Sequence, residues 1–305
     1  MKYRIKDICK QWANQMQRNA EEGINILYKL HGRLLSDNDI EPHTLNFDEL
    51  CVFGSETTIR GISSNGLVID LDHYLFWSWA AALLLGAMPD ANGNPNRLKQ
   101  DNDLNHLLRI VIKCIFSSLH ANEQPPIFDR DKLEHNARVP AYLGFSLLEG
   151  ISLKICEGYV NSSGIIIKNF SVNGEKYKSN ERCSNLGILL SLAIKQTTNE
   201  CLRAALTSIL RHLAKTFNCN YGSSLLFQLR NEALHRGASH QIIGETLLSI
   251  SLLLSLQFIE EQFDHNRYWV LVNCHMARMR PLPIRGFESD YAELSKTAIL
   301  MPEAF

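Results

Sequence analysis

The sequence lacks several features that would assign a class of protein at once. Its eight cysteines are scattered, with neither a C-x-x-C pair nor the paired Cys/His spacing of a zinc site. We therefore expect reduced thiols, no metal and no cofactor. Positive and negative charges are nearly balanced, because the formal net charge is -1 and the pI is about 6.8. This balance argues against a protein that coats nucleic acid, and any such contact must be local.

Long hydrophobic runs are missing as well. The two most apolar segments, 75–88 and 247–259, are shorter than the roughly 20 residues of a membrane-spanning helix. No apolar stretch follows the basic first residues, so they do not resemble a secretory signal. With 305 residues, 45% of them hydrophobic, the chain can form one large or two medium domains. We expect a cytoplasmic protein that does not bind membranes.

The N-terminal part, residues 1–130, is expected to be rich in α-helix and to have no assigned role. Apolar residues from Ile5 to about Leu35 recur at the three- and four-residue steps of an amphipathic helix. Between residues 45 and 71, glycines and β-branched residues favour a few short strands. Further helices are predicted over about 71–88 and 102–119, separated by a loop rich in Pro, Asn and Gly.

The C-terminal half is expected to be a separate helical domain over residues 137–264. The segment 121–140 contains consecutive prolines and is predicted to be a connector. Residues 164–178 resemble a β-hairpin, since Asn173-Gly174 suits a type I′ turn. Residues 265–305 are expected to form an irregular tail. Helices are predicted over about 141–159, 185–196, 198–217, 223–235 and 244–263, which makes the fold class mainly α with little β.

One segment of the predicted 223–235 helix concentrates residues with useful chemistry. It reads Phe-Gln-Leu-Arg-Asn-Glu-Ala-Leu-His-Arg-Gly and places Arg230, Asn231 and His235 near the helix end. Asn231 and His235 are four residues apart and share a face, while Arg230 lies at the edge of that face. The three side chains can therefore be presented to one cleft.

This set of groups suits cleavage of RNA without a metal. The ribose 2′-OH can act as an internal nucleophile once a base accepts its proton. Histidine titrates near neutral pH and can be that base, or the acid. A permanently charged arginine can hold the phosphate and offset charge in the transition state. The expected products are a 2′,3′-cyclic phosphate and a 5′-hydroxyl.

The segment resembles the signature of the HEPN superfamily, in which Arg and a polar residue are followed by His four to six residues after the Arg. The resemblance covers about residues 137–264 and implies a four-helix bundle, here with the hairpin as an insertion. Many HEPN members are homodimeric, metal-independent endoribonucleases of toxin–antitoxin and antiviral systems. The resemblance thus implies catalytic roles for Arg230 and His235, a supporting role for Asn231, RNA as substrate, and an antitoxin or defence protein as partner. Glu149, on an early helix, either orients Arg230 or His235 or is a solvated helix position.

Other interpretations remain open. The spacing of Arg and His also occurs at Arg130 and His135, so the motif can arise by chance. A catalytically silent HEPN module could instead bind RNA, nucleotide or a partner protein. Gly54-Ser55, followed by Asp70 and Asp72, resembles the start of a nucleotidyltransferase, a weaker alternative in which the aspartates would hold Mg²⁺. The plainer interpretation of that segment is a turn-rich strand pair before an Asp N-cap.

Overall fold

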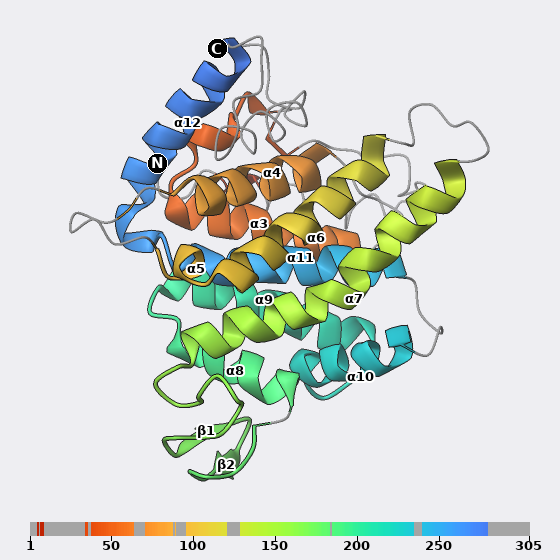
Figure 1. Cartoon of the computed structure of the whole chain (residues 1–305), viewed down its shortest axis with the longest axis vertical. Coiled ribbons are helices and arrows are strands. Elements are labelled where there is room, and N and C mark those ends of the chain that lie inside the picture. The colour runs from red at the N-terminus through yellow and green to blue at the C-terminus, as the bar shows by residue number, and fades with distance from the viewer. Residues whose placement is uncertain are drawn as a thin grey trace. The chain divides into compact units, whose positions relative to one another are not determined.

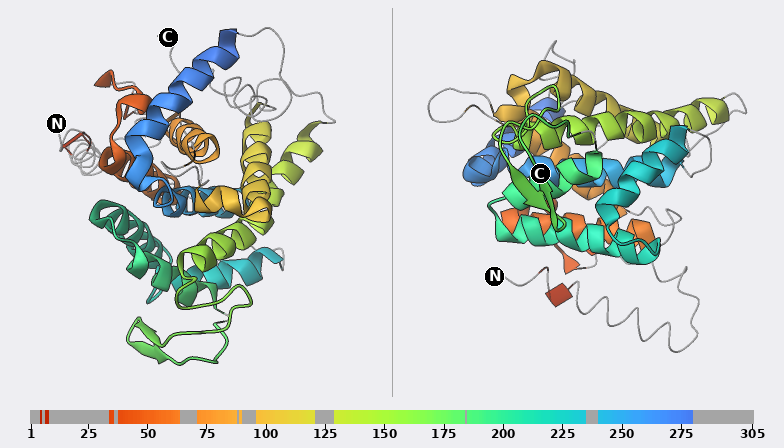
Figure 2. Two further views of the ribbon diagram at one scale, coloured as in Figure 1. Left: turned by 60° about the vertical axis from the view of Figure 1, so that its left-hand side comes forward. Right: turned by 90° about the horizontal axis from the view of Figure 1, so that it is seen from below.

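A computed structural model describes residues 5, 7–8, 34–35, 38–63, 71–87, 89, 96–120, 129–183, 185–234 and 240–279. Within these ranges, only the backbone is described at residues 71, 116–120, 129–137, 227, 231–234, 240–242 and 274–279. The described chain is mainly helical with one two-stranded sheet, which confirms the predicted fold class (Figures 1 and 2). No single helix in these ranges is long and apolar enough to cross a membrane.

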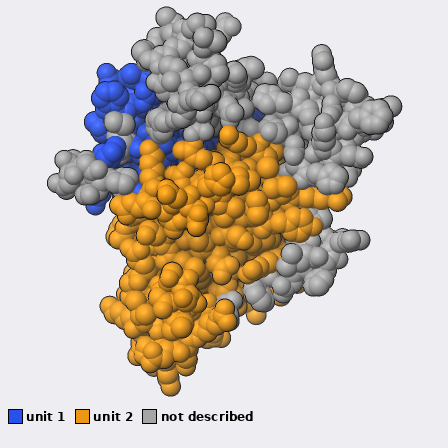
Figure 3. Space-filling model, in the orientation of Figure 1, with its two compact units in different colours: residues 1–96, 259–305 blue, residues 97–258 orange. Residues whose placement is uncertain are grey.

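The chain forms two compact units, coloured separately in Figure 3. Unit 1 comprises residues 1–96 and 259–305, and unit 2 comprises residues 97–258. The predicted boundary at 121–140 differs from this division, because α6 (Asn102–His120) packs against α7 (Asp129–Ile155) within unit 2. The α7 helix also begins before the predicted residue 141 and contains Pro140. A single proline removes one helical hydrogen bond without ending the helix here.

Unit 1 contains α3 (Phe47–Ser63), α4 (Leu71–Gly86) and α12 (Phe263–Met279). The strands predicted within 45–71 were wrong for residues 47–63. A reciprocal capping box begins α3, in which Asn46 Oδ1 accepts from the Glu49 amide and Glu49 Oε2 accepts from the Asn46 amide. The buried hydroxyls of Thr57 and Thr58 bond to carbonyl oxygens of their own helix. These bonds allow β-branched polar residues inside a helix.

The predicted irregular tail was wrong over residues 265–279, which belong to α12. Its first residue, Phe263, packs edge-to-face on Phe47 with ring centroids 5.3 Å apart. Arg267 donates from Nη1 to the carbonyl oxygen of Leu45 at 3.1 Å. These partners are distant in sequence, so α12 depends on contacts that its own sequence pattern does not reveal.

Unit 2 is a helical assembly around α7, which packs along α6 and α11 (His240–Leu256). Glycines allow α7 and α11 to approach closely. A Cβ at Gly144 would lie 3.0 Å from Leu247, and one at Gly244 would lie 3.0 Å from Pro140. The short helix α5 (Arg97–Gln100), with α8 (Leu186–Gln196), α9 (Glu200–Thr216) and α10 (Gly222–Leu234), completes the described helices of this unit.

The predicted hairpin is confirmed. Strands β1 (Phe170–Val172) and β2 (Glu175–Tyr177) pair antiparallel, with Val172 opposite Glu175. Asn173 and Gly174 both have positive φ angles, 52° and 83°, as a type I′ turn requires. The hairpin lies beside α8 at one end of unit 2 (Figures 1 and 2).

Close approach between α8 and α10 is expected to make Gly187 sensitive to substitution. A Cβ at position 187 would lie 2.5 Å from the carbonyl oxygen of Ser223, which is backbone and cannot turn away. Gly187→Ala should therefore lower the free energy of unfolding of unit 2 by about 1–3 kcal/mol, as overpacking does. Urea unfolding followed by far-ultraviolet circular dichroism measures this change. Gly158→Ala is the matched control, because nothing lies within 4 Å of its Cβ position, and equal stability of the two variants would contradict the prediction.

Candidate active site on helix α10

Arg230 lies on the last turns of α10, at the margin of the core of unit 2. Leu226 is one helical turn earlier on the same face and is fully buried. This anchor turns the face that carries Arg230 toward the neighbouring helices, and the arginine side chain is only 37% exposed. The guanidinium is therefore held at the protein surface while part of it remains accessible.

The partner of Arg230 is Glu149 on α7. Arg230 Nη1 lies 3.5 Å from Glu149 Oε2, and the glutamate side chain is 39% exposed. On either side of Glu149, Leu148 and Ile151 are buried and fix this part of α7 in the core. Glu149 is thus both paired with Arg230 and partly solvated, and its role in orienting Arg230 stays a prediction.

This ion pair leaves Arg230 able to bind an anion. A guanidinium has five N–H donors, so one carboxylate contact does not use them all. Because both side chains are more than a third exposed, the pair contributes only about 0–1 kcal/mol to stability. The guanidinium is thus paired with Glu149 and remains accessible to an anion, which suits a binding or catalytic role.

The other two candidate residues of the motif are described incompletely or not at all. The backbone of Asn231 continues α10 directly after Arg230, but its side chain lies outside the described part of the chain. His235 follows the helix and also lies outside the described residues. The structure thus brings together Arg230 and Glu149, and the roles of Asn231 and His235 stay predictions from the sequence.

Two buried thiols lie near this site and were not anticipated from the sequence. Burial raises the pKa of Cys183 against the smaller opposing effect of a hydrogen bond with the backbone of Asn185, and the charge of the Glu149 carboxylate also raises it. Burial, together with Cys183, raises the pKa of Cys156 to about 12. Both thiols are therefore protonated at neutral pH and are poor nucleophiles. Cys156 directly follows α7, whereas Cys183 comes after the hairpin, so no local pattern in the sequence could have predicted that the two thiols interact.

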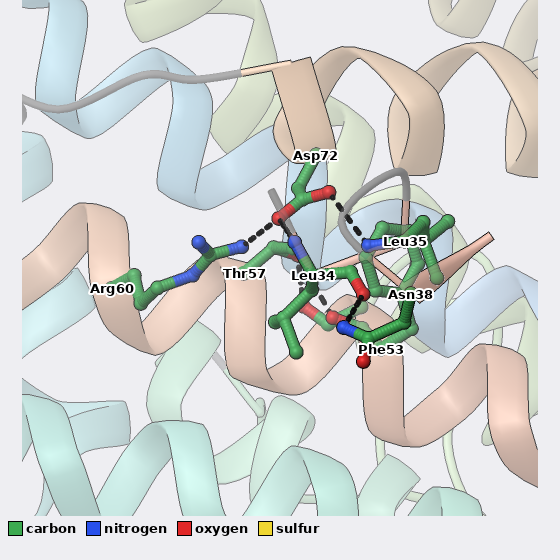
Figure 4. A network of polar contacts seen from close by, with 8 residues as sticks. Leu34, Leu35, Asn38, Phe53, Thr57, Arg60 and Asp72 are labelled. Carbon is green, nitrogen blue, oxygen red and sulfur yellow. Dashed lines mark hydrogen bonds and ion pairs between the residues drawn. The ribbon is translucent and has the colours of Figure 1, made fainter. Parts of the chain in front are cut away.

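The segment that resembles a nucleotidyltransferase forms a different structure. Gly54 and Ser55 lie inside α3 and are buried, so they do not form a phosphate-binding loop. Asp72 is fully buried and accepts from Arg60 Nη2 at 2.6 Å and from the amides of Leu34 at 2.7 Å and Leu35 at 3.4 Å (Figure 4). A carboxylate engaged in this way stabilises unit 1 and is not available to Mg²⁺. Asp70 lies outside the described residues.

Comparisons with known proteins do not identify a family for this chain. No protein-family model, no curated protein and no solved structure matches it. The resemblance to HEPN domains therefore rests on the motif of α10 and on the order of the surrounding helices. Function has to be inferred from the chemistry of these residues.

Proposed function

We propose that this chain is a metal-independent endoribonuclease of HEPN type that uses Arg230, Asn231 and His235. The observation that carries the proposal is the placement of Arg230 on α10, partly exposed and held by Glu149 of α7. An accessible arginine near a helix end can hold one phosphate of RNA with a charge-assisted hydrogen bond. The motif places a histidine five residues further along the chain.

The proposed reaction is an internal transfer at phosphorus. His235 accepts the proton of the ribose 2′-OH, and the 2′ oxygen forms a bond to the adjacent phosphorus. The bond from phosphorus to the 5′ oxygen breaks, and this oxygen leaves as a hydroxyl after taking a proton from solvent. Arg230 offsets the negative charge that builds up on the phosphate oxygens, while Asn231 orients the phosphate or the imidazole.

The biological role follows from the same resemblance. We propose a homodimer in which the motifs of both protomers meet in one cleft, acting as a toxin or antiviral effector in the cytoplasm. An antitoxin or other defence protein would then be its partner. The cleavage chemistry does not depend on these assignments, and it can be tested with the purified chain alone.

The proposed function is tested with a pair of synthetic oligonucleotides in EDTA. Wild-type protein should cut a single-stranded RNA and leave the 2′-deoxy oligonucleotide of the same sequence intact, because only the first has the internal nucleophile. Cleavage of both, or cleavage that requires added Mg²⁺, would contradict the proposal. Denaturing gel electrophoresis of labelled strands gives the readout.

Glu149 is proposed as a positioning residue for Arg230. Glu149→Gln keeps the size of the side chain but removes its charge, and it is expected to lower kcat/KM for RNA on the order of tenfold, or about 1.4 kcal/mol. Stability should change by less than about 1 kcal/mol, since the pair is exposed. Glu200→Gln, which removes an exposed ion pair with Arg203 on α9, is the matched control and should leave cleavage unchanged.

A double-mutant cycle separates positioning from a general structural effect. If Glu149 acts through Arg230, adding Glu149→Gln to Arg230→Ala should cause little further loss of activity. Additive losses in the two variants would show that Glu149 acts independently of Arg230.

A further inference from the structure

The β-hairpin next to α8 carries a concentration of positive charge. Residues 159–183 contain four cations and two acids, a net charge of +2, whereas the whole chain has a net charge of -1. All four cations are exposed, and a fifth lies beside them on α8. We call these residues the hairpin surface: Lys168, Lys176, Lys178, Arg182 and Lys195.

The two acids of this segment are engaged locally. The Glu175 carboxylate accepts from the hydroxyl of Tyr177 at 2.5 Å. Glu181 accepts from the backbone amide of Lys178 at 3.1 Å. Both carboxylates keep their charge, so the segment retains its net charge of +2, which suits a polyanionic partner.

Aromatic rings lie among these cations. Phe170 stacks on Tyr177 with ring centroids 5.0 Å apart, and Tyr159 packs edge-to-face on Phe170. Lys168 Nζ lies 5.0 Å from the centre of the Tyr159 ring. Both tyrosines are partly exposed. Aromatic rings flanked by cations are the usual platform for the bases and phosphates of single-stranded nucleic acid.

The hairpin is also fixed to the helices behind it. Lys195 of α8 donates from Nζ to the carbonyl oxygen of Ser171 at 3.0 Å. At the turn, Asn173 donates to Ser191 of α8 at 3.2 Å, and Ser191 bonds to Ser223 on the first turn of α10 at 3.1 Å. These contacts link the hairpin to the helix that carries Arg230. A surface that is ordered before binding loses less conformational entropy on binding.

We propose that the hairpin surface binds single-stranded RNA and holds the substrate for the site at Arg230, an inference that rests on the proposed function. RNA is favoured over other partners by the excess of cations and the interleaved tyrosines. The hairpin is also connected to the helix of that site, since Asn173 bonds to Ser191 and Ser191 bonds to Ser223 on the first turn of α10. Unit 2 would thus supply both substrate affinity and catalysis.

The test measures binding separately from cleavage. His235→Ala protein, which is expected not to cut RNA, is titrated into a fluorescein-labelled single-stranded RNA, and Kd is obtained from anisotropy at several salt concentrations. Adding Lys176→Gln and Lys178→Gln is expected to raise Kd at least tenfold. The slope of log K against log salt should become shallower by about 1.4, or about 0.7 for each lost phosphate contact. Both substitutions lie at exposed positions and should not affect folding.

The matched control removes two cations from α9 instead of from the hairpin. Arg211→Gln with Lys215→Gln removes the same charge from exposed positions on α9 and should leave Kd and the salt slope unchanged. Equal Kd values for the hairpin variant and its parent, or equal weakening by both pairs, would overturn the proposal. If wild type cuts RNA while the hairpin variant binds normally, only the hairpin inference fails. If wild type leaves RNA intact but binds it through the hairpin, only the nuclease proposal fails.

Discussion

Replacing His235 with alanine is expected to lower the rate of RNA cleavage by on the order of 10²–10⁴-fold, the usual contribution of general acid–base catalysis. The reason is chemical, because no other group of the motif can accept the 2′-OH proton at neutral pH. Arg230→Ala should also cause a large loss, since the phosphate would lose its cation. Single-turnover cleavage rates at saturating protein measure both effects apart from substrate binding.

The chain offers a matched control for this prediction. Arg130 and His135 have the same spacing as Arg230 and His235, and they lie on α7. His135→Ala is expected to leave the cleavage rate unchanged. Equal losses in His135→Ala and His235→Ala, or a normal rate in His235→Ala, would show that the α10 motif does not carry the chemistry.

The second large effect concerns the stability of unit 1. Asp72→Ala is expected to lower its free energy of unfolding by about 3–5 kcal/mol, because the substitution leaves the charge of Arg60 buried without its carboxylate. It also removes the acceptor of the Leu34 and Leu35 amides. This loss is far larger than the removal of an exposed ion pair would cause.

Tryptophan fluorescence during urea unfolding reports this change selectively. All four tryptophans belong to unit 1, and Trp77 and Trp79 are fully buried in α4. Asp264→Asn is the control, because it removes an ion pair with Arg267 in which the aspartate is 80% exposed. The control should cost less than about 1 kcal/mol. A similarly small cost for Asp72→Ala would mean that the buried network does not stabilise unit 1.

The elements that sequence patterns predicted correctly are those whose signals are local. The hairpin followed from Asn173-Gly174, and most helices of unit 2 followed from apolar periodicity, although α5 was not predicted and α7 begins before residue 141. The α3 helix was missed because its β-branched residues suggested strands, although Asn46 and Glu49 carry a capping signal that could have identified its start. The α12 helix was missed because its stabilising partners lie in a distant segment.

For the candidate site, the sequence indicated which residues to consider but not how they meet. The motif singled out Arg230, whereas the sequence left two interpretations of the role of Glu149 open. Their contact depends on the packing of α7 and α10, which no periodicity within either helix specifies. The clustered cations of residues 168–182 are visible in the sequence, but their exposure and the position of the tyrosines beside them come only from the structure.

Mapping the ends of the RNA fragments tests the central claim most directly. Purified wild-type protein is incubated with single-stranded RNA in EDTA, and the termini of the products are identified by their susceptibility to phosphatase, kinase and ligase treatment. The proposed mechanism predicts 2′,3′-cyclic phosphates and 5′-hydroxyls, absent with His235→Ala. Fragments with 5′-phosphates and 3′-hydroxyls would contradict it, because such ends require attack by water instead of the ribose 2′-OH.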